Sequence, residues 1–501
     1  DLSAENCVKA EVVEEGQNDV FKIESVIAGE EVIAKTPSSF DRSVEPVPGP
    51  DPVLSTPPVW RSSLSGGIDI LGIEHNELPL VQYSLVIQGG HLLDPEDKSG
   101  VAGLLSTMLM EGTANRTPEE LEEAIDLLGA TIRINAALES ITISVNCLSR
   151  NLDQTTELVR EILLEPRWDE KEFEIAKMKV INNLKRNAAN PNYISNQAFN
   201  NLLLGEEKLL ATSTSGTVES VEAITLDDLK IYYDHNISPS VATLLIVGDV
   251  NENDTREAFN NLSETWERKE VTIPAFSVSE EIPESKIYFV DFPGAKQSVI
   301  RIGSIYMPEN YFDHYASSVA NYKLGGSFNG SLNMILREEK GFTYGARSNF
   351  NLNNVYGTFS ANSSVRSDAT LESVQIFHDE MTRYREGITS EDLEFTKDAL
   401  LKSNARNYET LWALQGMLRQ INTFDLAADY ITTEQDMLRS MTLEEHEAQC
   451  RKYIDPEKMY YVIVGDAATQ LQPLSNLGFG QPELILQRDL QGDTDAGNEE
   501  I

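Results

Sequence analysis

Hydrophobic and polar residues alternate with period two along "GATIRINAALESITISVNCL", residues 129–148. This alternation is typical of paired strands that bury one face. Just before it, "TPEELEEAIDLLGA" follows a helical pattern, with Thr117 as the N-cap, Pro118 at the first position and Glu120 closing a capping box. The apolar positions that then share one helical face are Leu121, Ile125 and Leu128. A helix followed by two strands is therefore predicted.

The patterns recur along the chain as an internal repeat. The segments "ITLDDLKIYYDHNISPSVATLLIVGDV" (from Ile224) and "MTLEEHEAQCRKYIDPEKMYYVIVGDA" (from Met441) match at a spacing of 217. Two earlier blocks keep the same order. The matching pairs there are Glu174 with Glu394, Lys177 with Lys397, Arg186 with Arg406 and Asn187 with Asn407 at a spacing of 220, and Ser84 with Ser298 and Gly89 with Gly303 at a spacing of 214. Three blocks in one order predict two homologous domains.

Each repeat is predicted to be α+β, an antiparallel-type sheet packed with helices. The first domain is expected at 58–270 and the second at 287–480, joined by a linker at 271–286. Residues 1–57 are expected to be an acidic, proline-rich tail, because up to about residue 58 there are twelve acidic and four basic residues, and "EPVPGPDPVLSTPP" cannot form a ladder. The acidic stretch 481–501 is expected to be disordered.

Composition narrows the classes of function. The formal net charge is -41, which argues against nucleic-acid binding. A solvated acidic surface, a basic-peptide substrate and a salty habitat all remain compatible with this charge. The three cysteines are far apart and form neither a disulfide framework nor a zinc cluster. No apolar run reaches the ~18 residues of a membrane span. Because the sequence starts at Asp1, we expect a processed product or a fragment, without a visible signal peptide.

One helical segment has the residue pattern of a zinc-binding helix. An HxxEH helix places two His at i and i+4 on one face, with a Glu beside the metal as general base. In "GVAGLLSTMLMEGT" these slots hold Gly103, Ser106 and Thr107, none of which can ligate zinc or act as a base at neutral pH. The six histidines include no pair at i,i+4 spacing. We therefore expect this chain to bind no catalytic metal.

Over about residues 58–480 the chain resembles the pitrilysin/insulinase superfamily of zinc metallopeptidases, which includes mitochondrial processing peptidase. The similarity rests on "LSGGIDILGIEHNELPLV", "GVAGLLSTMLMEGTANRT", "LGATI", two "IVGD" strands and "LGGSFNGSLNMILREEKGFTYGARS", in one order. The resemblance implies half of a clamshell built from four such domains. It also implies that Gly103, Ser106 and Thr107 are degenerate metal positions, and that Asn182 and Asn183 stand where the family has its third ligand, a Glu.

The resemblance further implies a role for the second domain. In "LREEKGFTY", Arg337 and Tyr344 match the Arg/Tyr pair of the family's half that lacks zinc. A Tyr hydroxyl can stabilise an oxyanion and an Arg can anchor substrate. Gly325, Gly326 and Ser327 of "LGGSFNGS" would line the substrate cavity as a flexible segment. The alternative is that Arg337 pairs with a helix-surface acid and Tyr344 is an ordinary strand aromatic.

Three hypotheses of function are compatible with these observations. The first is the non-zinc half or subunit of a two-part zinc metallopeptidase, inactive alone, with zinc on a partner half or subunit bearing HxxEH and with peptide substrates. The second is a scaffold or assembly protein without catalysis. The third is a free-standing protein that binds basic peptides in a salt-sensitive way. Retention of Arg337 and Tyr344 favours the first. By resemblance we expect a periplasmic or otherwise exported protein, with a cytoplasmic one still open.

Overall fold

The computed structural model describes residues 40–41, 43–44, 56–205, 207–404 and 408–490. The chain divides into two units, Asp1–Pro50 and Asp51–Ile501. In the first unit the described residues form a turn in which the Asp41 carboxylate accepts a hydrogen bond from the Ser43 N–H at 3.0 Å. Most of the predicted tail at 1–57 lies outside the described residues. The helices, the sheets and the candidate site all belong to the second unit.

The first half of this unit is built on a six-stranded sheet with strand order β1-β2-β6-β3-β5-β4. Neighbouring strands are antiparallel except β2 and β6, which are parallel. The strands are β1 (Val59–Ser63), β2 (Asp69–Glu74), β3 (Leu80–Gln88), β4 (Thr131–Ala136), β5 (Ser140–Leu148) and β6 (Ala242–Gly248). The predicted paired strands at 129–148 are confirmed as β4 and β5.

The second half has the strand order β12-β7-β11-β8-β10-β9, which repeats the first sheet except at its edge, where the C-terminal β12 takes the place of β1. Here β7 runs parallel to both β11 and β12, and the other pairs are antiparallel. The strands are β7 (Lys286–Asp291), β8 (Gln297–Tyr306), β9 (Thr343–Leu352), β10 (Gly357–Arg366), β11 (Tyr460–Gly465) and β12 (Glu483–Ile485). The α+β class with two homologous sheet-and-helix halves is thus confirmed.

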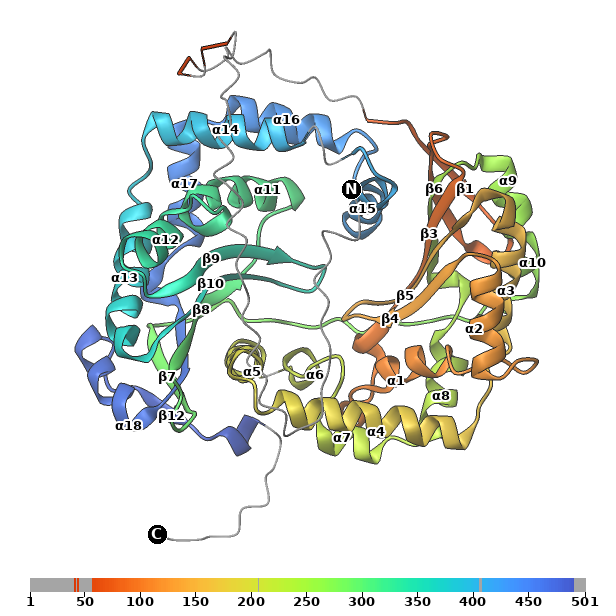
Figure 1. Ribbon diagram of the computed structural model, residues 1–501, viewed down its shortest axis with the longest axis horizontal. Helices are drawn as coiled ribbons and strands as arrows, with labels where there is room; N and C mark the ends of the chain where they lie inside the picture. The colour runs from red at the N-terminus through yellow and green to blue at the C-terminus, as the bar shows by residue number, and fades with distance from the viewer. Residues whose placement is uncertain (1–39, 42, 45–55, 206, 405–407, 491–501) are drawn as a thin grey trace, which may run out of the picture. The chain divides into compact units, whose positions relative to one another are not determined.

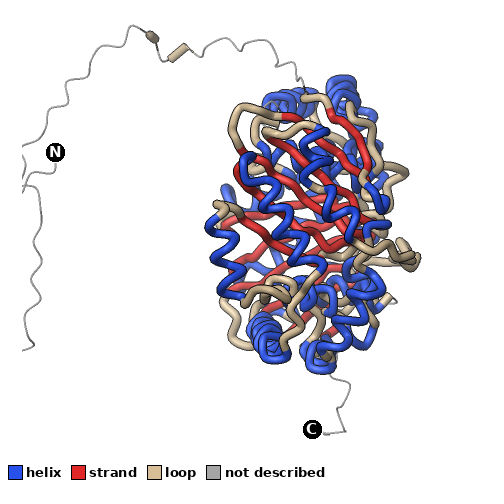
Figure 2. The backbone as a smooth tube through the Cα atoms, turned by 90° about the vertical axis from the view of Figure 1, so that its right-hand side faces the viewer, coloured by secondary structure: helices blue, strands red, loops and turns tan. Residues whose placement is uncertain are grey.

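Helices surround each sheet, and most of them lie on its outer face or pack on other helices, as Figures 1 and 2 show. In the first half they are α1 (Val101–Met108), α2 (Pro118–Leu127), α3 (Leu152–Leu164), α4 (Glu170–Asn187), α6 (Lys208–Ala211), α7 (Val218–Ala223), α8 (Leu226–Asn236), α9 (Glu252–Ala258) and α10 (Asn260–Thr265). In the second half they are α11 (Tyr311–Ala320), α12 (Ser331–Asn333), α13 (Thr370–Tyr384), α14 (Ser390–Asn404), α16 (Tyr430–Ser440), α17 (Leu443–Tyr453) and α18 (Ala467–Gln470). The predicted capping box is present at the start of α2. Residues 267–285, which include most of the predicted linker, form neither helix nor strand.

Each half also places one helix on the sheet of the other half. Helix α5 (Pro191–Leu204), from the first repeat, packs on β8 and β11. Helix α15 (Leu411–Phe424), from the second repeat, packs on β6, β3 and β2 (Figure 1). The helical residues buried in these contacts are Ile194, Ala198 and Phe199 on α5, and Leu414, Met417, Leu418 and Ile421 on α15. We call the two sheet faces that these helices cover the inner faces.

Strand registers correct one part of the predicted repeat. Val247 on β6 pairs with Gln82 on β3, and its repeat partner Val464 on β11 pairs with Val299 on β8. Strands β3 and β8 therefore correspond at a spacing of 217, and the predicted 214 is wrong here. A shift of three residues turns every side chain to the opposite face. The apolar runs in both strands make such a shift hard to detect from sequence.

The prediction of disorder from residue 481 onward is also wrong in its first part. Residues Glu483–Ile485 form β12, which adds to β7 as a parallel edge strand. Leu490 is buried, and its carbonyl accepts a hydrogen bond of 2.5 Å from the Gln197 side chain on α5. A strand that covers the open edge of β7 satisfies backbone groups that would otherwise remain unpaired. Residues 491–501 lie outside the described part.

Candidate functional site

Helix α1 carries the three positions predicted to be a degenerate metal site. The helix begins after Gly100, whose φ of 108° favours glycine. The buried Asp94 carboxylate accepts hydrogen bonds from the N–H groups of Gly100 and Ala102, at 2.7 and 2.8 Å. Asp94 also pairs with Nδ1 of the buried His91 at 2.8 Å. This network fixes the first turn of α1 within the half.

Two of the three positions on α1, Ser106 and Thr107, have hydroxyls that bond to the helix itself, and the third, Gly103, has no side chain. The Ser106 hydroxyl donates to the Ala102 carbonyl at 2.9 Å, and the Thr107 hydroxyl donates to the Gly103 carbonyl at 3.2 Å. Such bonds to the preceding turn are common for helical Ser and Thr. A Cβ atom added at Gly103 would lie 3.2 Å from the carbonyl oxygen of Thr214. The site therefore presents no imidazole or carboxylate, and a neighbouring loop fills the space beside it.

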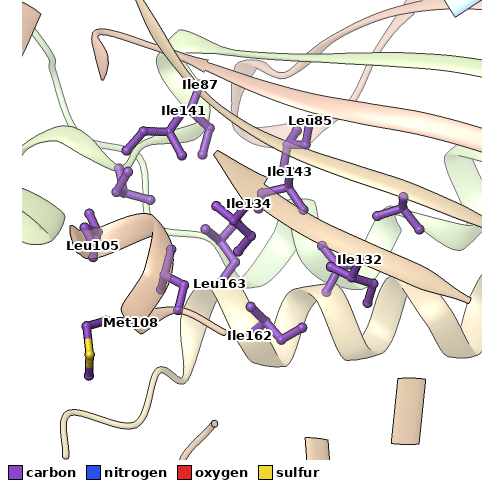
Figure 3. Close-up of a cluster of buried hydrophobic side chains, with 14 of the residues drawn as sticks. Leu85, Ile87, Leu105, Met108, Ile132, Ile134, Ile141, Ile143, Ile162 and Leu163 are labelled. Atoms are coloured by element: carbon purple, nitrogen blue, oxygen red, sulfur yellow. The ribbon is translucent and has the colours of Figure 1, made fainter. Parts of the chain in front are cut away.

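The surroundings of α1 provide no substitute ligands. Leu105 and Met108 pack in the apolar cluster beneath the sheet (Figure 3). On the neighbouring α4, Asn182 and Asn183 are exposed, and Asn183 accepts a hydrogen bond from Arg186. Within the described part of the chain, no three His, Cys, Asp or Glu side chains are grouped so that they could hold a metal ion. The residues present do not fit a zinc ion.

The glycine-rich segment of the second half is held against β9. Gly325 lies in a π-helical turn, Tyr322–Gly326, and a Cβ atom there would meet the Ser348 backbone nitrogen at 2.4 Å. The Asn321 side chain donates to the Ser348 carbonyl at 2.7 Å, which fixes the same contact. Gly326 is exposed, and the Ser327 hydroxyl donates to the carbonyl of Tyr322 at 3.0 Å. Gly325 is thus packed under β9, contrary to a flexible cavity wall, because close approach of two backbones requires glycine.

Arg337 and Tyr344 lie on two successive elements but have different surroundings. Arg337 is in the π-helical segment Met334–Glu339, where its Nε lies 3.1 Å from a Glu338 carboxylate oxygen. Its guanidinium also lies over the Phe328 ring, at 4.8 Å. Tyr344 is the second residue of β9 and is 90% exposed. The chain turns between them at Gly341, which has a φ of 64°. Arg337 therefore pairs with an acidic residue on the surface of its own helix, as the alternative interpretation expects. Tyr344 does not follow that alternative, because its ring is not packed as an ordinary strand aromatic would be.

Tyr344 lines a cavity of about 340 Å³ on the inner face of the second sheet. Two arginines share this lining, Arg301 on β8 and Arg347 on β9, whereas Arg337 is not part of it. Burial lowers the pKa of the Arg301 guanidinium from its ordinary value. The sequence interpretation missed both arginines. The sequence offered a signal for Arg301, which is the one charged residue in the run "SVIRIG".

Similarity to known proteins identifies the family of this chain. Residues 72–212 match the family model described as "Insulinase (Peptidase family M16)", and residues 223–400 match "Peptidase M16 inactive domain". The chain belongs to the M16 peptidase family. The M16 match for the second repeat includes both Arg337 and Tyr344, and the match for the first includes the three degenerate positions on α1.

Among M16 relatives, the "Non-peptidase homolog YmxG" of Helicobacter pylori is 21% identical over 402 residues, covering 80% of this chain and 92% of the relative. The crystal structure of a peptidase M16 inactive domain from Pseudomonas fluorescens has a TM-score of 0.77 at 23% identity, covering 82% of this chain and 99% of the other. The first half of the periplasmic protease PqqL from Escherichia coli has a TM-score of 0.69 at 15% identity, with coverages of 89% and 100%. These structures share the fold of this chain.

Other M16 matches cover less of this chain and carry the names of subunits. The cytochrome b-c1 complex subunit 1 of Bos taurus is 22% identical over 232 residues, or 44% of this chain and 46% of the relative. The mitochondrial-processing peptidase subunit beta of Mus musculus is 24% identical over 213 residues, or 42% of each chain. The family therefore includes both a named peptidase subunit and a respiratory-complex subunit. No helix in the described ranges is long and apolar enough to cross a membrane.

Proposed function

We propose that this M16 homologue is the peptide-binding half of a two-part metallopeptidase and is inactive by itself. It would close over a zinc-bearing M16 partner, either a separate subunit or another half of a longer protein, and act on peptides. The observation that carries this proposal is the exposure of Tyr344 at the edge strand β9, beside an arginine-lined cavity on the inner face. Helix α1, by contrast, has nothing to offer a metal.

The proposed contribution of this chain is to bind and orient the substrate. The Tyr344 hydroxyl would donate a hydrogen bond to the scissile carbonyl and stabilise negative charge as it develops on that oxygen. Arg337 would anchor the substrate backbone through its guanidinium, which requires it to leave Glu338 when the partner closes. The partner's zinc would supply the activated water. Gly325 has a supporting role, because it lets the preceding turn pack against β9.

The second candidate function is a scaffold or assembly protein. The pairing of Arg337 with Glu338 favours it, because the guanidinium is then occupied on the surface of its own helix. The relatives named as a non-peptidase homologue and as a respiratory-complex subunit also support it. Exposure of Tyr344 supports the peptidase half instead, since an aromatic ring left in water gives up the stability that packing would provide. If the chain is a peptidase half, we propose that it is exported to the periplasm, by analogy with the periplasmic protease PqqL.

A hydrolysis assay separates the two candidates. A quenched fluorogenic peptide is incubated in zinc-containing buffer with this chain alone, with a zinc-bearing M16 chain of the same organism alone, and with both. The peptidase half predicts hydrolysis only in the mixture, and a loss of about 10²–10³-fold with Tyr344→Phe. The matched control is Tyr356→Phe in the β9–β10 turn. A partner whose rate is unchanged by this chain would support the scaffold.

A further inference from the structure

The cavity beside Tyr344 has an unusual balance of charge for this protein. The chain has 81 acidic and 40 basic side chains, yet two arginines and no carboxylate line this cavity. The lining residues are Asn192, Gln297, Val299, Arg301, Thr343, Tyr344, Gly345, Arg347, Asn362, Ser363 and Ser364. Its chemistry is therefore that of an anion site within an acidic protein.

Strand pairing places the two arginines in one row, on the two strands that flank β10. Asn362 on β10 pairs with Arg301 on β8 and with Arg347 on β9, so the three form one row across the sheet. Adjacent strands are about 4.8 Å apart, which puts the two arginine backbones about 10 Å apart on one face. Two long side chains at that separation can converge on one group above Asn362, whose amide can donate a further hydrogen bond.

Neither arginine has a counter-ion among the described residues. Arg301 is half-buried, its buried Nε has no hydrogen-bond partner among the described residues, and its guanidinium carbon lies 5.8 Å from the Phe199 ring centroid on α5. Arg347 is exposed and forms no ion pair within the described part of the chain. Several other arginines of this half are in ion pairs, for example Arg385 with Asp455 at 2.7 Å. Burying a guanidinium N–H without an acceptor is costly, and a bound anion would remove that cost.

We infer that Arg301 and Arg347, with Asn362 between them, form a subsite that binds a carboxylate of a peptide next to Tyr344. The inference deepens the proposed function, on which it rests for the peptide. Carboxylate fits because its planar fork matches a guanidinium in a bidentate arrangement. The carboxylate can be the C-terminus of the peptide or an Asp or Glu side chain. Substrates would then carry negative charge at one position, opposite to the basic peptides that the net charge of -41 favours.

The test is direct binding to the whole chain, without a partner and without hydrolysis. Four labelled peptides of one neutral sequence differ only in a free or amidated C-terminus and in Glu or Gln at one internal position. Fluorescence anisotropy is measured at low and at physiological salt. Loss of the carboxylate is expected to weaken binding by about ten- to a hundred-fold, the range for a hydrogen bond to a charged group. The peptide pair that shows the loss identifies which carboxylate is bound.

Three variants assign the effect to the cavity. Arg347→Gln, at an exposed position, is expected to abolish the preference for the carboxylate. Arg301→Lys is expected to keep the charge and the fold but to reduce the preference, because an ammonium cannot bind bidentately. The matched control is Arg133→Gln on β4, the edge strand of the first sheet, which should leave the preference unchanged.

The outcomes also separate this inference from the proposed function. Equal binding of acid and amide peptides would overturn the subsite, even if the mixture with a zinc-bearing partner hydrolyses peptide. Displacement of peptide by inorganic phosphate but not by acetate would overturn the choice of carboxylate. A preference that depends on Arg347, together with no hydrolysis in the mixture, would uphold the subsite and reject the peptidase half.

Discussion

The two sheets of this protein pair their corresponding strands in the same way, but the side chains in equivalent rows on their inner faces differ. With β3 and β8 aligned at a spacing of 217, the same row can be followed on both sheets. It reads Ser84, Ser144 and Arg133 on the first sheet, and Arg301, Asn362 and Arg347 on the second. The first row has the buried Ser84 where the second has Arg301, whose buried Nε has no hydrogen-bond acceptor among the described residues. The repeat has kept the strand register and changed the side chains that can meet a ligand.

The same contrast holds between α1 and the start of β9. On α1, the hydroxyls of Ser106 and Thr107 donate hydrogen bonds to carbonyls of the same helix, and the Thr214 carbonyl lies beside Gly103. At the start of β9, Tyr344 faces solvent at a cavity. The first half therefore presents short side chains at these positions, whereas the second presents an exposed aromatic ring beside a cavity. Four changes test how far this contrast extends.

The largest effect is expected where α5 covers the second row. Phe199→Ala removes a buried ring that packs on β8 and should lower the free energy of unfolding by about 3–5 kcal/mol. The equivalent position on α15, at the spacing of 220, is the exposed Arg419. Arg419→Ala should change stability by less than about 0.5 kcal/mol. Urea unfolding measures both, and similar losses would mean that the two exchanged helices do not differ in this way.

Rebuilding the metal motif on α1 should fail. The triple change Gly103→His, Ser106→Glu and Thr107→His is expected to destabilise the protein by about 3 kcal/mol, because it crowds the Thr214 carbonyl and brings polar groups into a packed site. Calorimetric titration should detect no stoichiometric zinc binding, since α4 offers only Asn182 and Asn183. Ser106→Ala serves as the mild control. Tight binding of one zinc ion would show that the closed site is easily reopened.

The buried carboxyl of Glu434, on α16 beside α15, should make the stability of the protein depend on pH. Burial raises the pKa of Glu434 to about 7, although the Tyr311 hydroxyl donates to it at 2.6 Å. The folded state then binds more protons than the unfolded state between pH ~4.5 and ~7, so stability falls as pH rises through this window, by up to about 3 kcal/mol. Glu434→Gln should flatten this part of the profile. An unchanged slope in thermal melts from pH 5 to 8 would contradict the assignment.

The smallest effect concerns the second row itself. Arg301→Met removes a charge that has no partner and should raise the free energy of unfolding by about 1 kcal/mol. Arg347→Met, at an exposed position, should stay within about 0.5 kcal/mol. A gain in stability together with a loss of peptide binding would be typical of a residue kept for function. A loss of stability in Arg301→Met would mean that its stem and its contact with Phe199 outweigh its charge.

Local patterns predicted much of this fold. The capping box at Thr117, the hairpin of β4 and β5 and the two "IVGD" strands could be read because they depend on residues near in sequence. The exchange of α5 and α15 could not, because an amphipathic helix does not encode which sheet it will cover. The same limit hid Arg301 and Arg347, which lie on different strands. Only the register through Asn362 brings them together.

For the candidate site, residue types proved more informative than local geometry. The sequence alone shows that Gly103, Ser106 and Thr107 carry no ligand side chains, and the structure adds that both hydroxyls donate to carbonyls of their own helix. Residue type singled out Arg337 and Tyr344, but it could not reveal that Arg337 pairs with Glu338 or that Tyr344 is exposed at a cavity. The glycine segment was misjudged at Gly325, since a glycine run looks the same in a mobile loop and in a tightly packed turn.

The exchange of α5 and α15 has a consequence for the ancestry of this chain. A single repeat would carry one helix with no sheet of its own to cover and one sheet face with no helix upon it. Two copies could satisfy each other by reciprocal exchange, as in a domain-swapped homodimer with twofold symmetry. The present chain has the connectivity expected if such a dimer was fused by gene duplication. Once the copies were joined, each could change its side chains independently, as the different inner-face rows of the two sheets illustrate.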